Sequence, residues 1–228
     1  MGKGKLIVLE GIDGSGKSAQ YRLLCDRMEK DKIAYNHIVF PRYGKESSAL
    51  IRLYLGGAFG SRPGDVNAYA ASTFYAVDRF ASFRDDWGRI YESGGLILSD
   101  RYTTSNAVHQ GSKLPEAELP AFFDWLADLE YGKMGLPEPD LVIYLDVDLE
   151  TSRRRMRQRE QMTHTSADIH EQDSGYLARC LRTAELACEH YGWTRIPFLK
   201  DGRERDLDEK NAEIYRIIRQ SLGNETAI

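Results

Sequence analysis

The amino-acid sequence predicts a three-layer α/β protein in which a five-stranded parallel sheet is flanked by helices on both faces. Short apolar runs with β-branched members alternate along the chain with longer segments of helical spacing. Such alternation is typical of parallel strands joined by crossover helices. A glycine-rich stretch separates the first apolar run from the first helical segment. The five apolar runs span residues 5–10, 33–40, 96–99, 141–147 and 194–199, and the clearest helical segments span 19–30, 67–92 and 176–191.

Length and composition limit the kinds of protein that this chain can be. With 228 residues and no repeat or low-complexity stretch, we expect one domain over residues 1–223 and a short tail over 224–228. The formal net charge of −4 disfavours a general nucleic-acid binder. Neither a secretory h-region nor a stretch of membrane-spanning length is visible. We therefore expect a cytoplasmic protein without a membrane or nucleic-acid partner.

The first apolar run leads into LEGIDGSGKS, which matches the phosphate-loop (P-loop) pattern G-x-x-x-x-G-K-[ST]. Glycines at positions 14 and 16 can adopt positive φ, so successive backbone N–H groups can point toward an anion. A helix starting near Lys17 adds its positive end to the same place. Lys17 is expected to reach the β and γ phosphates of ATP, and Ser18 to face Mg²⁺. The predicted ATP contacts are Gly11, Gly14, Ser15, Gly16, Lys17 and Ser18.

Polar residues follow the second and third apolar runs, at the sheet edge where ligands of such folds bind. FPRYG, residues 40–44, places Arg42 between aromatic residues, and an arginine can hold a phosphate while a ring covers a base. DRY, residues 100–102, places Asp100 where a carboxylate would meet Mg²⁺ or its waters, and adds Arg101. Alternatively, these residues form a turn with a solvated arginine and a simple ion pair.

The helical segment 67–92 carries an aromatic residue and a cation on one face. Tyr75 and Arg79 are four residues apart, so a ring that stacks and a cation that donates hydrogen bonds could hold a flat heterocycle together. A core aromatic beside a surface arginine is the alternative.

A basic stretch follows the fourth apolar run and passes into polar residues. Arg155 and Arg159 share a helical face by their spacing. The stretch 152–175 could form a mobile lid that brings arginines over a transferring phosphoryl group and excludes water. The alternative is a solvated helix followed by a loop.

Together these motifs resemble those of the thymidylate kinases, a family of nucleoside monophosphate kinases with the P-loop kinase fold. The resemblance covers LEGIDGSGKS, FPRYG, YAVDR, DRYTTSN and the arginine-rich lid with the stretch from Asp168 to Glu171, in that order. It implies transfer of the γ-phosphoryl group of ATP to dTMP, giving dTDP and ADP for dTTP synthesis, with Mg²⁺ as cofactor. It also implies a homodimer formed through the long helices around 67–92.

The same resemblance implies roles for individual residues. Tyr75 stands where the family usually stacks a phenylalanine on thymine, and His109 where relatives often place an aromatic residue near the ribose 2′-position. Because Gly14 replaces an arginine found in some members, the chain is similar to bacterial-type members whose catalytic arginine comes from the lid. The implied catalytic residues are Asp13, Lys17, Arg42, Arg101, Arg155 and Arg159; the implied acceptor-binding residues are Asp13, Phe40, Arg42, Tyr43, Tyr75, Arg79, Arg101, Asn106 and His109; the implied Mg²⁺ ligands are Ser18 and Asp100.

Two other functions are possible on the same scaffold. A deoxynucleoside kinase would need a carboxylate base after the second strand, because its acceptor is a neutral hydroxyl; here the first charge is that of Arg42, and Glu46 comes later. A non-enzymatic nucleotide switch would need no cations for a second anion. A phosphate oxygen is already a nucleophile, so a monophosphate kinase works by positioning and charge stabilisation.

Overall fold

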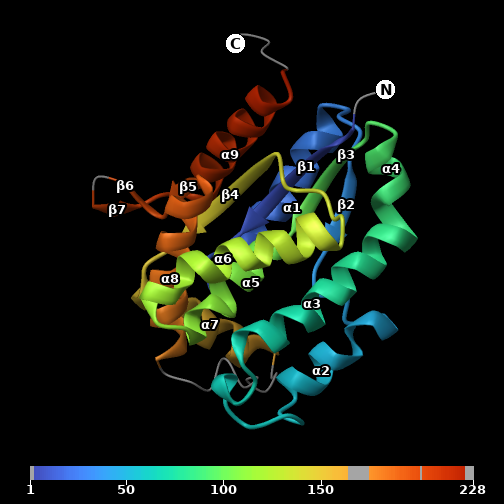
Figure 1. Cartoon of the computed structure of the whole chain (residues 1–228). Helices are drawn as coiled ribbons and strands as arrows, with labels where there is room; N and C mark the ends of the chain where they lie inside the picture. Colours follow the sequence, from blue (N-terminus) through green and yellow to red (C-terminus); the bar gives the residue numbers. More distant parts are fainter. Residues whose placement is uncertain (1–2, 164–174, 201, 224–228) are drawn as a thin grey trace.

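Five parallel strands form the central sheet, in the order β2–β3–β1–β4–β5. The computed structural model describes residues 3–163, 175–200 and 202–223, and Figure 1 shows helices on both faces of this sheet. The predicted three-layer α/β class is confirmed. The predicted tail at 224–228 and residues 164–174 of the predicted lid lie outside the described residues. The strands are β1 (Lys5–Glu10), β2 (Asn36–Val39), β3 (Leu96–Asp100), β4 (Leu141–Asp146) and β5 (Thr194–Pro197).

Two apolar layers enclose the central strand β1. Ile7 and Leu9 pack into a cluster with residues of α1 (Lys17–Lys30) and α9 (Leu207–Ser221), whereas Leu6 and Val8 join a cluster on the opposite face. Successive strand side chains point to opposite faces, and a strand buried on both is apolar at nearly every position. This burial explains the unbroken apolar run that predicted the strand.

The helices follow the predicted pattern with additions between the motifs. The predicted helix 67–92 consists of α3 (Ala68–Ser82), a π-helical segment (Phe83–Trp87) and α4 (Gly88–Glu92), and the Asn67 side chain caps its start by accepting from the Ala70 N–H at 2.8 Å. The predicted helices 19–30 and 176–191 are confirmed as α1 and α8 (Tyr176–Tyr191). Further helices are α2 (Ala49–Leu55), α5 (Thr103–His109), α6 (Leu119–Ala127) and α7 (Leu149–Thr163).

Two predicted strands are too long by two residues or more. The run 33–40 yields β2 from Asn36, because the Ile33 N–H closes the end of α1 by donating to the Met28 carbonyl at 2.9 Å, while its side chain packs on the core. The run 194–199 is divided, since β5 ends at Pro197 and Leu199 begins a short antiparallel pair, β6 (Leu199–Lys200) with β7 (Arg203–Glu204). Ile33 therefore packs on the core without pairing in the main sheet, and Leu199 pairs with Glu204 in the short antiparallel sheet.

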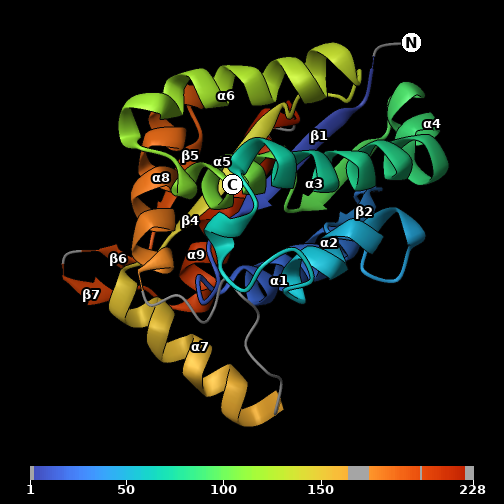
Figure 2. The ribbon, with the colours of Figure 1, turned by 60° about the horizontal axis from the view of Figure 1, so that its bottom comes forward.

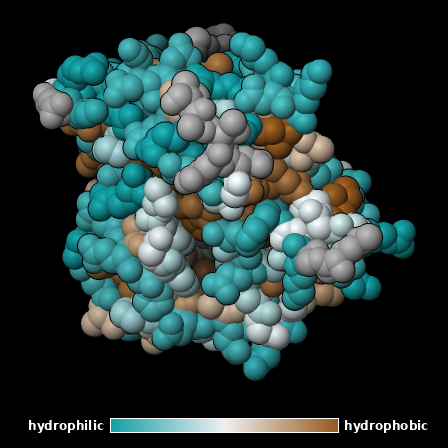
Figure 3. Space-filling model, turned by 90° about the horizontal axis from the view of Figure 1, so that it is seen from above, coloured by the Kyte–Doolittle hydropathy of each residue, from teal (hydrophilic) through white to brown (hydrophobic). Residues whose placement is uncertain are grey.

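The strand order decides which motifs meet. Because β3 lies beside β1, with Asp100 paired to Leu9, the segment after β3 adjoins the P-loop that follows β1. Helix α7, which follows β4, lies at the periphery of the molecule in Figure 2. Figure 3 looks down on the end of the molecule that is at the top of Figure 1, near the N-terminus. This surface is mostly hydrophilic, with apolar side chains toward its centre. Residues of the P-loop, FPRYG, YAVDR and DRYTTSN, together with Arg155 of the arginine-rich stretch, thus line adjoining cavities at the carboxyl end of the sheet.

Candidate active site

The P-loop encloses an anion-sized cavity. Gly14 and Gly16 have φ values of +77° and +86°, which glycine adopts without steric cost. A Cβ at Gly14 would also lie 2.4 Å from the Ser152 carbonyl oxygen of α7. Glycine is therefore required at this position both for its positive φ and for the lack of space for a side chain. The cavity measures about 190 Å³. Its lining is Ile12, Asp13, Gly14, Ser15, Gly16, Lys17, Ser18, Ala19, Arg101 and Arg155.

Lys17 forms a buried ion pair with Asp100, the last residue of β3. Burial lowers the pKa of the Lys17 ammonium, and the nearby positive charge of Arg101 lowers it further, while Asp100 acts in the opposite direction. The predicted phosphate cation and the predicted Mg²⁺ carboxylate are thus in contact.

A larger pocket of about 290 Å³ adjoins the P-loop cavity. It brings together eight of the nine residues predicted to bind an acceptor, and Lys17 and Asp100 join them in its lining. Asp13, Lys17 and Arg101 line both cavities. We call the larger cavity the acceptor pocket. The predicted acceptor residues in its lining are Asp13, Phe40, Tyr43, Tyr75, Arg79, Arg101, Asn106 and His109.

Arg101 projects between the two cavities from a strained backbone position. Its φ is +67°, which is rare for a residue with a Cβ. Its guanidinium donates to Asp13 at 2.9 Å, to Ser105 at 3.2 Å and to His109 Nε2 at 3.0 Å. Because a guanidinium cannot accept a hydrogen bond, His109 Nε2 must be the acceptor and its proton must lie on Nδ1, which faces the Tyr176 hydroxyl at 2.9 Å. His109 is therefore neutral in this arrangement.

A buried carboxylate that the sequence analysis missed supports Arg101. Glu10 ends β1, is fully buried, and lies 3.5 Å from the Arg101 guanidinium. It also accepts from Thr104 at 2.6 Å and Ser105 at 2.7 Å. A charged residue at the end of an apolar strand, directly before the P-loop glycine, was the available signal.

Arg79 is held by a second carboxylate that the sequence analysis missed. Both N···O distances to Glu130 are 2.6 Å, and the remaining Nη1 donates to the Tyr102 carbonyl at 3.3 Å. Burial would lower the pKa of Arg79, but the charge and hydrogen bonds of Glu130 outweigh it and raise the pKa. Asn106 Nδ2 also donates to Glu130, at 3.3 Å. Glu130 lies in a π-helical segment (Asp128–Lys133) with no local motif to mark it.

Arg42 lies beside the acceptor pocket and is held on its α3 side. Its backbone N–H donates to Asp78 at 2.8 Å, and its guanidinium pairs with Asp78 at 3.4 Å and also with Asp86. Its neighbours Pro41 and Tyr43 line the acceptor pocket, but Arg42 itself is not one of the described residues in that lining. Its role toward a phosphate stays a prediction.

Arg155 of α7 reaches the P-loop. Its Nη1 donates to the Gly14 and Ser15 carbonyls at 3.3 Å each, and its Nη2 pairs with Glu204 at 3.0 Å. The helix is fastened there, because Ser152 Oγ donates to the Asp13 carbonyl at 2.5 Å. The side chain of Arg159 and the stretch from Asp168 to Glu171 lie outside the part of the chain that the structure describes.

Gln110 was also missed by the sequence analysis. It lines the acceptor pocket next to His109, is 1% exposed, and its Oε1 has no hydrogen-bond partner among the described residues. A buried amide oxygen without a partner is costly unless a ligand supplies one. Its position just beyond DRYTTSN was the signal that could have found it.

Within the described residues, no helix is long and apolar enough to cross a membrane, and no three His, Cys, Asp or Glu side chains are grouped as metal ligands.

Comparisons with known proteins show which proteins this chain is similar to in sequence and in fold. The family model of thymidylate kinase matches residues 9–191. The chain is 31% identical over 190 residues to thymidylate kinase of Mycobacterium tuberculosis, covering 82% of this chain and 87% of that protein. It is 30% identical over 230 residues to thymidylate kinase of Ruegeria pomeroyi, covering 97% and 98%. The structure of thymidylate kinase from Candida albicans has a TM-score of 0.72 at 21% identity and covers 98% of this chain and 94% of that chain, a likeness of fold.

Proposed function

The chain belongs to the thymidylate kinase family, and on that premise we propose that its two adjoining cavities transfer the γ-phosphoryl group of ATP to dTMP, giving dTDP and ADP. One observation carries this assignment: Asp13, Lys17 and Arg101 line both the P-loop cavity and the acceptor pocket. A phosphoryl group that passes between the cavities would remain beside the same two cations. A nucleotide switch would have no use for the second, cation-lined pocket.

ATP would bind with its phosphates in the P-loop cavity. The loop amides, the N-terminus of α1 and the Lys17 ammonium all favour negative charge there. Ser18 and Asp100 supply hard oxygen atoms, which fit Mg²⁺, and phosphate oxygens and waters would complete its shell. When bound, Mg²⁺ would neutralise phosphate charge. Asp100, which holds Lys17 in this structure, would then be shared with the ion.

The dTMP phosphate would lie near Arg101, with Asp13, Tyr43 and Arg42 around it. A phosphate oxygen attacks directly, so the protein needs no general base and acts through alignment and charge. Arg155, already at the P-loop, would stabilise the charge that develops on the transferred group. Arg159 stays a second candidate for this role.

The thymine ring would occupy the end of the acceptor pocket lined by Phe40 and Tyr75. Arg79, fixed by Glu130, presents donors at a set position, and the side chains of Asn106 and Gln110 add amide groups to the same lining. The unpartnered Gln110 Oε1 would accept from the base N–H group. His109, neutral and held between Arg101 and Tyr176, would lie near the sugar.

A neutral hydroxyl acceptor fits this pocket less well. Asp13, a carboxylate that lines both cavities, already accepts from Arg101, and the cations of the shared lining would have no anion to bind. A deoxynucleoside kinase is therefore not favoured.

We propose a homodimer formed through α3. Tyr69, Val77 and Phe80 are exposed to 38%, 47% and 39%, and their spacing places them in one stripe of the helix. Light scattering on the wild type and on Phe80→Glu tests this: a dimer that the substitution dissociates supports the proposal, and a wild-type monomer contradicts it.

The cytoplasmic location of the protein stays a prediction.

The activity is tested by measuring ADP release from ATP and Mg²⁺ with dTMP, dUMP, UMP and thymidine as separate acceptors. We expect dTMP to be preferred and thymidine to be inert. A methyl-sized pocket is worth about 1–3 kcal/mol, so dUMP should be turned over about 10- to 200-fold less efficiently. Phosphorylation of thymidine alone would show that the arginines do not serve a monophosphate. With no acceptor active, a nucleotide switch would be the better account.

A further inference from the structure

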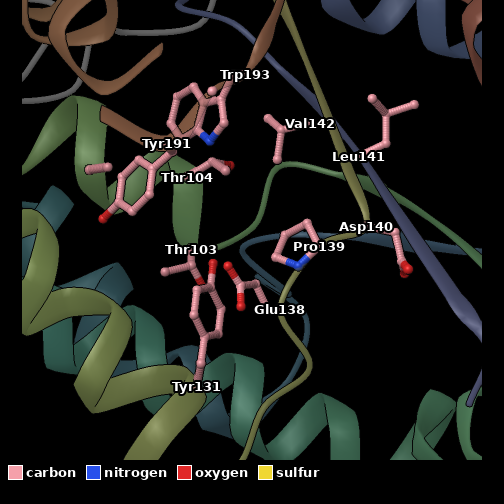
Figure 4. A pocket seen from close by; sticks show the side chains of 12 residues that line it. Thr103, Thr104, Tyr131, Glu138, Pro139, Asp140, Leu141, Val142, Tyr191 and Trp193 are labelled. Atoms are coloured by element: carbon pink, nitrogen blue, oxygen red, sulfur yellow. The ribbon is translucent and has the colours of Figure 1, made fainter. Parts of the chain in front are cut away.

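A cavity of about 140 Å³, shown in Figure 4, lies across α5 from the acceptor pocket. It is partly open to solvent and is lined by α5, the π-helical segment Asp128–Lys133, the segment that leads into β4 with the start of that strand, and the turn that joins α8 to β5. Helix α5 forms the partition: Thr103, Thr104 and Ala107 line this cavity, whereas Asn106 and His109 line the acceptor pocket. We call it the back cavity.

The back cavity has the size and walls for one aromatic ring. A cavity of about 150 Å³ holds benzene, which is close to the volume found here. Its walls include the rings of Tyr131, Tyr191 and Trp193, as Figure 4 shows. The last two are stacked, with centroids 5.5 Å apart and an interplanar angle of 7°. Aromatic faces attract both rings and cations.

The charge of the lining is negative. Glu138 and Asp140 line the back cavity, and none of its described lining residues is basic. Asp140 is satisfied by Lys5 at 2.6 Å and by the Leu6 N–H at 2.8 Å. Glu138 makes no ion pair with any residue that the structure describes. Burial and the charge of Glu130 raise the pKa of the Tyr131 hydroxyl, and the charge of Glu138 adds a smaller contribution in the same direction. The carboxylate of Glu138 is thus available to a cation beside the rings.

Two hydrogen bonds link threonines that line the back cavity to the carboxylates that contact Arg79 and Arg101. Thr103 Oγ1 donates at 2.9 Å to Glu130, the carboxylate that holds Arg79. Thr104 Oγ1 donates at 2.6 Å to Glu10, the carboxylate that faces Arg101. Displacement of either hydroxyl would change the support of an arginine in the acceptor pocket.

We propose that the back cavity is a second binding site, specific for a small single-ring aromatic cation and coupled to the acceptor pocket through Thr103 and Thr104. The ring packs against Tyr131, Tyr191 and Trp193, and the cationic group pairs with Glu138. Its ligand differs in charge from that of the acceptor pocket, whose cations select an anion.

The test uses three probes of nearly equal shape: benzamidine, a cation; benzamide, which is neutral; and benzoate, an anion. Isothermal titration calorimetry on the whole chain, without nucleotide, should show the tightest binding for benzamidine and none for benzoate. Glu138→Gln should weaken benzamidine binding about tenfold, because one charged partner is lost. Glu92→Gln, an exposed glutamate outside the lining, should leave it unchanged.

Coupling is measured by repeating the dTMP titration with saturating benzamidine, and the reverse. Each ligand should change the affinity of the other by the same factor, because coupling between two sites is reciprocal. The proposal is overturned if Glu138→Gln leaves benzamidine binding intact, if dTMP displaces benzamidine competitively, or if dTMP affinity is the same with and without the cation.

Discussion

The guanidinium of Arg79 and the carboxylate of Glu130 form a two-point ion pair with both N···O distances at 2.6 Å, although the residues are 51 positions apart. The side chains are 2% and 0% exposed. A buried pair of this kind adds little net stability, but the removal of one partner leaves an uncompensated charge. The pair therefore fixes Arg79 in the acceptor pocket and makes the fold depend on Glu130.

Glu130→Gln should lower the free energy of unfolding by about 3–5 kcal/mol, because Arg79 would keep its buried charge without a carboxylate. Urea unfolding measures this. Glu118→Gln, at an exposed position, is the control and should unfold like the wild type. If Glu130→Gln unfolds at the wild-type urea concentration, the pair does not stabilise Arg79 as described.

Lys17→Met should reduce kcat/KM by about 30- to 1,000-fold, since one cation at a transferring phosphoryl group is worth about 2–4 kcal/mol. The loss should be far smaller for Lys30→Met, which changes an exposed lysine at the end of the same helix. Steady-state kinetics with ATP and dTMP give the comparison, and circular dichroism checks that both variants fold. A Lys17→Met variant with most of its activity would refute the role of Lys17.

Arg155→Ala should lower kcat by a similar factor and change the KM for dTMP little, because Arg155 contacts the P-loop and does not line the acceptor pocket among its described residues. Arg157→Ala alters an exposed arginine on the same helix and serves as the control. Arg155→Lys should not restore full activity, because an ammonium lacks the planar fork of donors. Equal kcat values for the two alanine variants would assign the lid function to another residue.

The burial of Lys113 should make the stability of the fold depend on pH. Burial lowers its pKa to about 7, with a smaller opposite contribution from Cys180, and its Nζ donates to the Tyr54 hydroxyl at 2.8 Å. Between pH 7 and its ordinary pKa the unfolded chain binds the proton more readily than the folded chain, so stability should rise as the pH rises.

Lys113→Met should remove this dependence. Between pH 7 and pH 9 the unfolding free energy of the wild type should rise by up to about 2 kcal/mol more than that of the variant. Chemical denaturation at the two pH values measures the difference. Parallel changes in both proteins would mean that Lys113 is protonated throughout this range.

Local patterns predicted the parts of the site that depend on neighbours in sequence. The P-loop needs a strand, glycines at fixed positions and a helix start, and all of these lie within residues 5–30. Asp100 and Arg101 could be placed beside the P-loop because a parallel sheet brings the ends of its strands to one edge. Tyr75 and Arg79 reach the acceptor pocket together because of their helical spacing.

Contacts between distant residues could not be predicted in this way. Glu10 and Arg101 are 91 positions apart, and Glu130 lies in a segment with no motif. The sequence indicated that Arg42 is a cation near the site, but it did not indicate that Asp78 and Asp86 are its partners. Which carboxylates of the chain contact Arg42 depends on how the helices pack.

The sequence by itself determined the fold class, the P-loop, the order of the motifs and the family, because each follows from short-range spacing and from the rule that parallel strands end at one edge. The tertiary structure decided which carboxylates hold Arg42, Arg79 and Arg101. It also decided that α5 separates two cavities of opposite charge. Those features depend on how helices pack against a sheet, where side chains far apart in the chain must share one buried volume and satisfy one another's charges.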